Sequence, residues 1–387
     1  MNTRTNKPQQ VELADILSSW KEELTQVYKF SPVQLKAMND IILCRTSGAG
    51  GHINYCNNAN CGHKEQSYNS CRNRHCPKCQ FIKQEMWVDK LKSRLIPGRY
   101  FHIVFAIPQQ LHSLFYINQT TCYNVLFQSA KEALLNAGKN ISFLGAQVGA
   151  VAILHTWGQT LTYHPHIHML VPAGGLSEDN TEWVTSPKKF FVPVKALSAM
   201  FRGILIRKIK SLIQKDKLYF PTGFPGFIKL KEQLYLKNWN VYSKKARGGI
   251  NSVLAYLGRY THRVAITNNR LKTINNRRVC FRYKDYKKGG RQCSMELDAV
   301  EFARRFLQHI LPSNFYKIRY FGILATAHLN TKREQSIVLV GKTMWLPVLE
   351  GLTAYEVLRE LTGKDPLLCQ VCKKGLMTRC EGMRQNE

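Results

Sequence analysis

Acidic residues are scarce in this sequence. Only 25 Asp and Glu face 56 Lys and Arg among 387 residues, which leaves a formal net charge of +31 at pH 7. So large an excess of positive charge favours a polyanionic partner, and nucleic acid is the leading candidate. Hydrophobic residues still make up 44% of the chain. The chain can therefore bury a core and fold as a globular protein of two or three domains.

Long apolar runs are also missing. No uninterrupted stretch reaches the roughly 18 residues that a membrane-spanning helix needs. The opening MNTRTNKPQQ contains no apolar region of the kind found in signal peptides. We therefore expect a cytoplasmic protein with no membrane partner. The sequence also has no phosphate-binding Walker loop, no internal repeats and no low-complexity tract.

The twelve cysteines are unusual for a disulfide scaffold in so long a chain, and they are clustered. Six lie between Cys44 and Cys79, and three lie between Cys369 and Cys380. Clustered cysteines in a reducing compartment more often bind metal. The isolated ones are interpreted as packed residues: Cys122, Cys280 and Cys293.

Hydrophobic periodicity indicates a mixture of helices and strands. Residues 11–44 are expected to be helical, with Ser31 as an N-cap and Pro32 at the first helical position. Strands are expected at 101–107, 148–157, 166–171 and 277–286, a basic helix at 194–215, and a helix running into a strand at 250–266. Without strict alternation of strand and helix, this order predicts an α+β fold with an antiparallel sheet.

Two cysteine pairs in the first cluster have spacings typical of zinc ligands. Four residues separate Cys56 from Cys61, two separate Cys76 from Cys79, and fourteen lie between the pairs. These four thiolates are predicted to hold one tetrahedral Zn²⁺. Four neighbours form a second site, exchange into the first, or pack and hydrogen-bond around one zinc: Cys71, His75, His63 and His52. The tail cysteines Cys369, Cys372 and Cys380 resemble half a site, so they bind metal with a distant histidine or form a free tail.

Basic side chains are interleaved with these cysteines. Arg72, Arg74 and Lys78 would project from a loop made rigid by metal, which suits contact with DNA. The alternative is a solvated basic surface.

The stretch YHPHIHML, residues 163–170, places three histidines within five positions. In a strand, His166 and His168 share one face, because residues two apart point the same way. Two imidazoles on one sheet face suit a divalent metal. The alternative is a pair of surface histidines on a wet sheet.

Two tyrosines lie further along the chain. Tyr256 and Tyr260 are four residues apart, hence on one helical face, at the edge of the apolar stripe. The alternative is an amphipathic pair of half-buried tyrosines. Between Lys244 and Arg291, fourteen Lys and Arg alternate with aromatic residues against one acid. Such a pattern predicts a groove for single-stranded DNA, with four candidate contacts: Arg259, Arg263, Arg282 and Lys284.

Together these motifs resemble the two-tyrosine HUH transposases of rolling-circle insertion sequences. The matching stretches cover most of the chain in the order found in that family. They are CRTSGAGGH (44–52), SCRNRHCPKCQ (70–80), HTWGQTLTYHPHIHMLVPAGGL (155–176), YLGRYTHRVAI (256–266), FRYKDYKKGGR (281–291) and RRFLQHILPSNFYKIRYFGIL (304–324). One departure is the four-residue gap between Cys56 and Cys61, where two residues are expected.

The resemblance implies an architecture of three consecutive parts. A helical and zinc-ribbon-like DNA-recognition domain would span 1–95, and an HUH endonuclease-type catalytic domain would span 96–325. A C-terminal segment with a cysteine-rich tail would follow at 326–387. The HUH domain implies an antiparallel sheet flanked by helices.

The resemblance also implies roles for individual residues. His166 and His168 would hold a catalytic Mg²⁺ or Mn²⁺, and Tyr256 and Tyr260 would be the nucleophiles. The third metal ligand is open among His155, Gln159, His164 and His262. The implied activity is nicking and rejoining of single-stranded DNA at element ends and target through 5′-phosphotyrosine links. Host replication machinery would be a partner, and a bacterial protein would be associated with the nucleoid.

Two other functions fit parts of the same pattern. A replication initiator or conjugative relaxase would use the same HUH chemistry without inserting DNA. A non-enzymatic zinc-ribbon DNA-binding protein would explain the charge and the cysteines, but it would leave the histidine strand and the tyrosine pair without a purpose.

Overall fold

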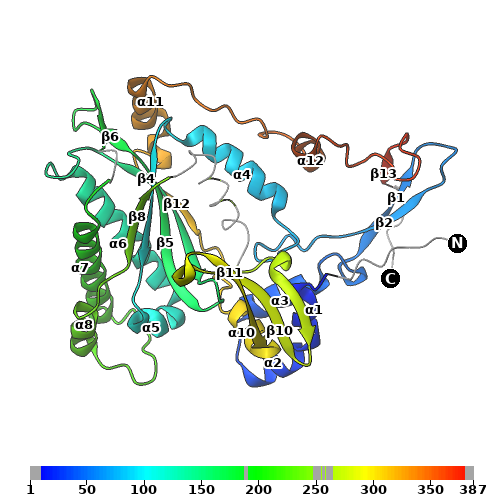
Figure 1. Cartoon of the computed structure of the whole chain (residues 1–387), viewed down its shortest axis with the longest axis horizontal. Helices are drawn as coiled ribbons and strands as arrows, with labels where there is room; N and C mark the ends of the chain where they lie inside the picture. The colour runs from blue at the N-terminus through cyan, green and yellow to red at the C-terminus, as the bar shows by residue number, and fades with distance from the viewer. Residues whose placement is uncertain (1–9, 187–190, 247–253, 255–257, 259–264, 380–387) are drawn as a thin grey trace. The chain divides into compact units, whose positions relative to one another are not determined.

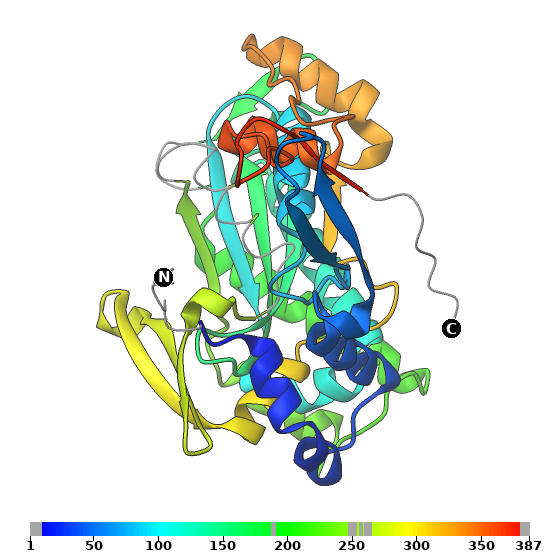
Figure 2. The same ribbon diagram turned by 90° about the vertical axis from the view of Figure 1, so that its right-hand side faces the viewer.

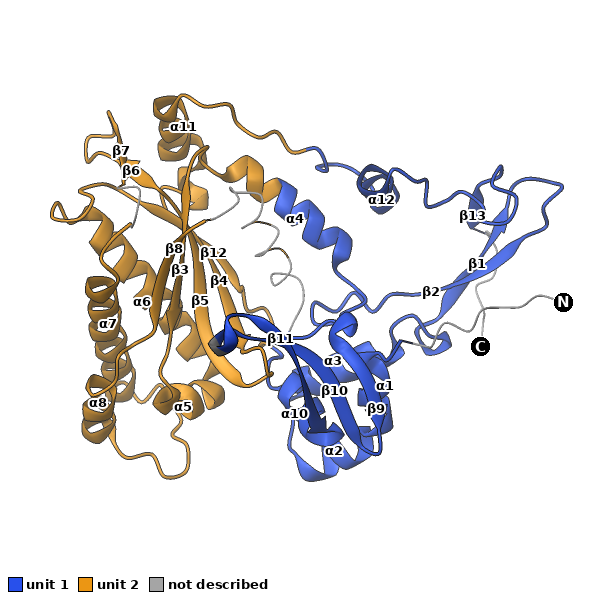
Figure 3. Ribbon diagram, viewed as in Figure 1, with its two compact units in different colours: residues 1–89, 262–310, 348–387 blue, residues 90–261, 311–347 orange. Residues whose placement is uncertain are grey.

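A computed structural model gives the arrangement of most of the chain (Figure 1). It describes all residues except 1–9, 187–190, 247–253, 255–257, 259–264 and 380–387. The chain forms two compact units, coloured in Figure 3. Unit 1 comprises residues 1–89, 262–310 and 348–387, and unit 2 comprises residues 90–261 and 311–347. This grouping differs from the three consecutive parts expected from the sequence, because 262–310 and the tail belong with the N-terminal segment.

Unit 2 is built around a five-stranded sheet in which every neighbouring pair is antiparallel. The strand order is β12-β4-β5-β3-β8. The strands are β3 (Tyr100–Ala106), β4 (Gly149–Trp157), β5 (Tyr163–Pro172), β8 (Val241–Lys245) and β12 (Ile318–Gly322). An antiparallel sheet flanked by helices confirms the predicted α+β class.

One face of this sheet packs on helices and forms the core of unit 2. Alternate residues of β3, such as Phe101, Ile103 and Phe105, point into this core and are buried. The helices that cover this face are α5 (His112–Ile117), α6 (Gln119–Lys139), α7 (Val194–Gln214) and α8 (Phe227–Tyr235) (Figure 1). In α7, Leu197, Phe201 and Leu205 recur every four residues, so one stripe of the helix is buried.

Smaller elements of unit 2 include the hairpin β6 (Gly174–Leu176) and β7 (Trp183–Thr185), a one-turn π-helix (Leu329–Arg333) and α11 (Glu334–Val340). Helix α4 (Phe81–Arg94) begins in unit 1 and ends in unit 2. Among the described residues, no helix combines the length and apolar character that crossing a membrane requires.

Unit 1 contains a helical part that packs beside a second antiparallel sheet. Its helices are α1 (Leu13–Ser19), α2 (Lys21–Val27), α3 (Pro32–Leu43) and α10 (Ala299–Leu307). The sheet has the order β11-β10-β9, from β9 (Leu271–Asn275), β10 (Arg278–Asp285) and β11 (Arg291–Asp298). Ser31 caps α3 as predicted, since its side chain accepts from the Gln34 amide.

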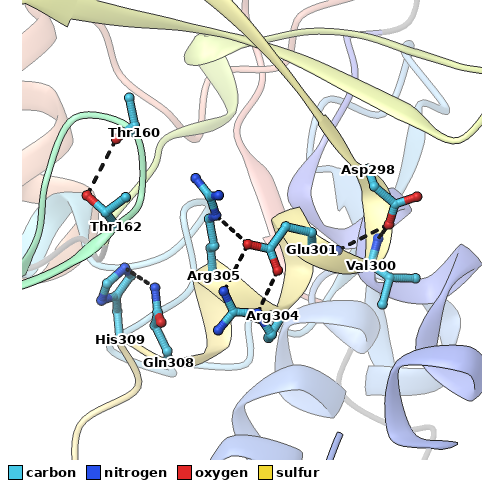
Figure 4. A network of polar contacts seen from close by, with 9 residues as sticks. All are labelled: Thr160, Thr162, Asp298, Val300, Glu301, Arg304, Arg305, Gln308 and His309. Atoms are coloured by element: carbon cyan, nitrogen blue, oxygen red, sulfur yellow. Dashed lines mark hydrogen bonds and ion pairs between the residues drawn. The ribbon is translucent and has the colours of Figure 1, made fainter. Parts of the chain in front are cut away.

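Polar contacts fix the start of α10 (Figure 4). The Asp298 carboxylate accepts from the amides of Val300 and Glu301, at 2.9 and 3.3 Å. Glu301 in turn pairs with Arg304 and Arg305, each at 2.6 Å. An aspartate at the N-cap satisfies amides that have no partner within the helix.

A small three-stranded sheet completes unit 1. Strands β1 (Gly51–Cys56) and β2 (Lys64–Tyr68) form a hairpin, and β13 (Met377–Arg379) from the end of the chain pairs with β1. Helix α12 (Ala354–Thr362) precedes β13. Figures 1 and 2 both show the C-terminal segment beside the hairpin.

Candidate functional site

Three histidines converge on one face of the five-stranded sheet. His166 and His168 lie on β5, and His155 lies on the adjacent β4, directly opposite His166. The ligand nitrogens of the three all lie within 4.8 Å of one another. Of the four candidates for a third ligand, His155 is the one that the structure groups with His166 and His168. His262 is outside the described residues.

The sheet pairing explains why these side chains meet. His166 and His168 share a face because they are two residues apart, while the intervening Ile167 points into the core. The register then places His155 across from His166 on the same face. Two ring nitrogens are already in contact, since His166 Nε2 lies 3.0 Å from His168 Nε2. The site is thus held by the central strands of a sheet with a packed core.

The backbone determines which nitrogen of His166 carries its proton. His166 Nδ1 lies 2.6 Å from the carbonyl oxygen of His164. A carbonyl only accepts, so Nδ1–H must donate. In the neutral ring, Nε2 therefore keeps its lone pair and faces His168.

His102 is a fourth histidine in contact with this cluster. It lies on β3, the strand on the other side of β5. Its Nε2 is 2.7 Å from His168 Nδ1, and the two rings are nearly parallel, with centroids 4.9 Å apart. His168 is therefore held from both ring nitrogens, by His102 on one side and His166 on the other.

Burial keeps these histidines neutral at ordinary pH. It lowers the pKa of His166 to about 3 and that of His102 to about 4. The pKa values of His155 and His168 are lowered well below the usual value, first by burial and then by neighbouring histidines. The charge of Lys317, which is 7% exposed, also lowers the pKa of His155. Neutral imidazoles have lone pairs to offer a cation.

The predicted nucleophiles Tyr256 and Tyr260 lie outside the described residues, as do Arg259 and Arg263. Within the predicted helix, Leu254 and Gly258 are described and helical. Leu254 is buried.

The first cysteine cluster brings together Cys44, Cys71, Cys76 and Cys79. The Sγ atoms of Cys44 and Cys71 lie 3.5 and 3.6 Å from Cys79 Sγ. Hydrogen bonds from Cys71 and Cys76 lower the pKa of Cys79, and contacts with Cys71 and Cys79 raise that of Cys76. Such competition among close thiols is relieved when a metal takes all four as thiolates. Cys44 is the C-cap of α3, so this cluster joins the helical part to the loop.

The second cluster brings together Cys56, Cys61, Cys369 and Cys372. The single predicted site of Cys56, Cys61, Cys76 and Cys79 is therefore corrected, because the two predicted pairs lie in different clusters. The β1–β2 hairpin carries one pair away from the other, and the chain tail supplies its partners.

The predicted accessory ligands lie outside both clusters, apart from Cys71. His75 is buried, and its Nε2 accepts from Arg74 Nε at 3.3 Å. The carbonyl of His63 accepts from the Cys56 amide at 2.9 Å, which shapes the turn of the hairpin. Neither ring belongs to a group that could hold a metal ion in the described part of the chain.

The predicted DNA contacts differ in exposure. Arg72 is exposed, with a positive φ of 55°. Arg74 is half-buried, and burial lowers its pKa. Lys78 pairs with Glu12. On β10, Arg282 and Lys284 are exposed, and Arg282 also donates to the Asn269 carbonyl at 3.0 Å.

Comparisons with known proteins identify the family. Residues 149–333 match a family model described as "Putative transposase", and residues 16–107 match one described as "Transposase zinc-binding domain". No solved structure matches.

Two relatives are also described as transposases. The chain is 38% identical over 382 residues to "Putative transposase y4qJ" of Sinorhizobium fredii, covering 96% of this chain and 95% of the relative. It is 30% identical over 295 residues to "Transposase for insertion sequence element IS801" of Pseudomonas savastanoi pv. phaseolicola, covering 76% and 70%. The chain therefore belongs to the IS91/IS801 family of transposases, which are HUH rolling-circle types.

Proposed function

We propose that this transposase nicks and rejoins single-stranded DNA through 5′-phosphotyrosine intermediates in rolling-circle transposition. The observation that carries the proposal is the convergence of His155, His166 and His168 on one sheet face. Family membership supports a DNA-cleaving enzyme with DNA as its partner. The finer steps are argued from the residues below.

Three neutral imidazole nitrogens form a suitable donor set for a divalent cation. The residues that would hold it are His155, His166 and His168. When bound, Mg²⁺ or Mn²⁺ would act as a Lewis acid on the scissile phosphate. The two ligands on β5 need no deprotonation at neutral pH, because burial has already lowered their pKa values.

The surrounding groups orient the ligands. The His164 carbonyl holds the His166 proton on Nδ1 and leaves Nε2 available. If His168 offers its Nε2 lone pair, its proton must sit on Nδ1 and be donated to His102 Nε2, 2.7 Å away. His102 would thus be a positioning residue that sets the tautomer of His168.

The proposed chemistry conserves the number of phosphodiester bonds. The phenol oxygen of Tyr256 or Tyr260 attacks phosphorus in line, losing its proton, and the bond from phosphorus to the 3′ oxygen breaks. The 3′ oxygen leaves with a proton as a free hydroxyl. In the reverse step a 3′ hydroxyl attacks the phosphotyrosine, and the tyrosine regains its proton. Two tyrosines would let one hold the element's end while the other cuts the target.

Unit 1 would contribute DNA recognition. The zinc-binding domain matched at 16–107 carries the exposed Arg72, and β10 carries Arg282 and Lys284. Arginine and lysine contacts to phosphate position a strand without reading its sequence. Arg74 and Lys78 would contribute less, because one is half-buried and the other is paired with Glu12.

A covalent-adduct assay tests the nucleophiles. Purified protein with Mn²⁺ and a labelled single strand spanning the element's end should give a shifted band on a denaturing gel. Tyr256→Phe combined with Tyr260→Phe should abolish that band. Tyr242→Phe is the control, since Tyr242 lies on the same sheet face as the histidines. A band that survives the double change, or disappears in the control, would assign the nucleophile elsewhere.

A second assay tests the histidine site. His166→Ala combined with His168→Ala should abolish cleavage while DNA retention in a gel shift stays largely intact. His328→Ala serves as control, because His328 lies outside the cluster. Loss of DNA retention with the fold intact would indicate a binding role for the two histidines instead.

The alternatives are weakened by the comparisons. Membership of a transposase family speaks against a replication initiator or relaxase. A purely DNA-binding zinc-ribbon protein would gain nothing from three neutral histidines whose ring nitrogens lie within 4.8 Å of one another. The adduct assay separates it from an enzyme, because only the enzyme becomes joined to DNA.

A further inference from the structure

The thiols of the second cysteine cluster come from opposite ends of the chain. Cys56 and Cys61 flank the β1–β2 turn, whereas Cys369 and Cys372 lie just before β13. The two contacts that join the pairs span 316 and 308 residues of sequence. The zinc-binding domain matched at 16–107 includes only the first pair.

The spacing of these four sulfurs is that of a tetrahedral zinc site. Cys56 Sγ lies 3.6 Å from Cys372 Sγ, and Cys61 Sγ lies 3.8 Å from Cys369 Sγ. With Zn–S bonds of about 2.3 Å, the edge of a regular tetrahedron of sulfurs is about 3.8 Å. An iron–sulfur cluster would hold its cysteines further apart, because several iron and sulfide atoms lie between them.

This sheet has almost no hydrophobic core apart from its cysteines. The buried residues in its cluster are Cys56, Cys369 and Met377, with Cys61 and Cys372 packed against them. Nearly all of β2 is exposed, and so are Ile53 and Tyr55 of β1. Three short strands with so little buried apolar surface are not stable alone. Metal binding supplies the missing free energy in domains of this kind.

The tail is shaped to bring its cysteines close to the hairpin. A Cβ atom added at Gly375 would lie 2.4 Å from Cys56 Sγ, so only glycine permits this approach. The Gly375 amide donates to Cys372 Sγ at 3.3 Å. Asn57 and Leu376 exchange two hydrogen bonds, at 2.7 and 3.0 Å. Amide donation to a sulfur that must become a thiolate is favourable.

We propose that Cys56, Cys61, Cys369 and Cys372 bind a second structural Zn²⁺ and close a zinc ribbon from the two ends of the chain. This site is separate from the one formed by Cys44, Cys71, Cys76 and Cys79. It goes beyond the proposed DNA chemistry and does not depend on it.

One consequence concerns incomplete chains. The hairpin of β1 and β2 has only two of its four ligands until Cys372 has been synthesised. The ribbon therefore forms only in a chain that extends past that residue. Any shorter copy would present an open half-site in its zinc-binding domain.

Zinc stoichiometry tests the proposal. The full-length protein is prepared with His166→Ala and His168→Ala so that the histidines contribute no metal, and zinc is measured by mass spectrometry. Two zinc ions per chain are expected. Cys369→Ser with Cys372→Ser should leave one, and so should Cys56→Ser alone. Combining all three changes should still leave one, because the residues share a site. Cys280→Ser with Cys293→Ser is the matched control and should keep two.

Chemical protection in the unsubstituted protein gives a second measurement that needs no folded variant. Cys369 and Cys372 should resist alkylation until a strong chelator is added, and peptide mapping would then show both labelled. Cys280 should be labelled at the same rate with and without chelator. Alkylation of the tail cysteines in zinc-loaded protein would overturn the proposal. So would two zinc ions in the Cys369→Ser, Cys372→Ser protein, or disulfides joining the two pairs.

Discussion

The histidine sheet of unit 2 and the ribbon of β1, β2 and β13 place their candidate metal ligands in opposite ways. In the sheet, one face is packed on α6 and α7, and the histidines stand on the other. In the ribbon, the cysteines are themselves most of the core. The packed core of the sheet positions the histidines without a cation, whereas the strands of the ribbon require a bound metal in order to fold.

This difference has a physical cause. A strand buried on one face gains free energy from every second side chain, which fixes the positions of the others. The exposed strands of the ribbon gain little in this way. Structural zinc sites compensate by binding free energies of about 10–16 kcal/mol in small peptides. The two regions should therefore respond differently to the same treatment.

Removal of zinc should have the largest effect and should separate the regions completely. A strong chelator is expected to unfold the ribbon, with amide exchange in β1, β2 and β13 rising to the rate of an unfolded chain. Exchange in β3, β4 and β5 should remain slow, because their protection comes from packing. Hydrogen–deuterium exchange with peptide resolution measures both at once. Equal loss of protection from amide exchange in the two regions would contradict the proposal that only the ribbon depends on metal for its stability.

Truncation of a hydrophobic side chain should destabilise the sheet of unit 2 much more than the ribbon. Phe105 is completely buried, and its ring centroid lies 5.0 Å from that of Phe201. Phe105→Ala should lower the free energy of unfolding of unit 2 by about 3–5 kcal/mol. Ile53→Ala in the ribbon, where the side chain is 43% exposed, should cost under about 0.5 kcal/mol. Urea denaturation of both variants measures the two losses of free energy of unfolding. Losses of similar size would contradict the prediction.

The same contrast decides what could be predicted from the sequence. Strand β3 was expected at 101–107 and spans Tyr100–Ala106, and the basic helix expected at 194–215 spans Val194–Gln214. Both follow from local periodicity. The pairing of the cysteines does not, because Cys61 finds Cys369 across 308 residues. Spacing alone favoured the nearer pair, Cys76 and Cys79.

The histidine site was partly predictable for a related reason. His166 and His168 share a face by strand geometry, so the sequence indicates them directly. His102 meets His168 across 66 residues and a strand pairing, and nothing in its neighbourhood, YFHIVFA, distinguishes it from a packed strand residue. Cys44 was similarly hidden, because it closes a helix instead of belonging to a short-spaced pair.

His102 offers a smaller and more specific test of the sheet. His102→Phe keeps a ring but removes the nitrogen that contacts His168, so Mn²⁺ should bind about 10–100-fold more weakly. The expected result is a higher Mn²⁺ concentration for half-maximal cleavage, with DNA retention unchanged. His102→Gln should recover part of the loss, since its carbonyl oxygen can accept from His168 Nδ1–H.

A control distinguishes positioning from packing. His112→Phe alters a half-buried histidine outside the cluster, whose pKa is also lowered to about 4 by partial burial. It should leave the Mn²⁺ requirement unchanged. If His102→Gln behaved like His102→Phe, the role of His102 would be steric.

Acid should weaken the histidine sheet gradually. The folded-state pKa values of His166 and His102 are about 3 and about 4, below the unfolded value of 6.5. Between those limits the unfolded chain binds protons that the folded chain does not, so the free energy of unfolding falls as pH falls. Each such histidine lowers the free energy of unfolding by about 1.4 kcal/mol for every pH unit of acidification within this window. Above the window it has no effect on the pH dependence.

The slope can be assigned to one histidine at a time. Urea denaturation at pH 7, 6 and 5, without added Mg²⁺ or Mn²⁺, should show His102→Gln losing stability less steeply than the unsubstituted protein below pH 6. Amide exchange in β3 and β5 reports on the sheet separately from acid release of zinc in unit 1. Identical slopes would mean that His102 is protonated in the folded protein, and it could then no longer accept the His168 proton. The tautomer argument for this site therefore depends on that measured difference.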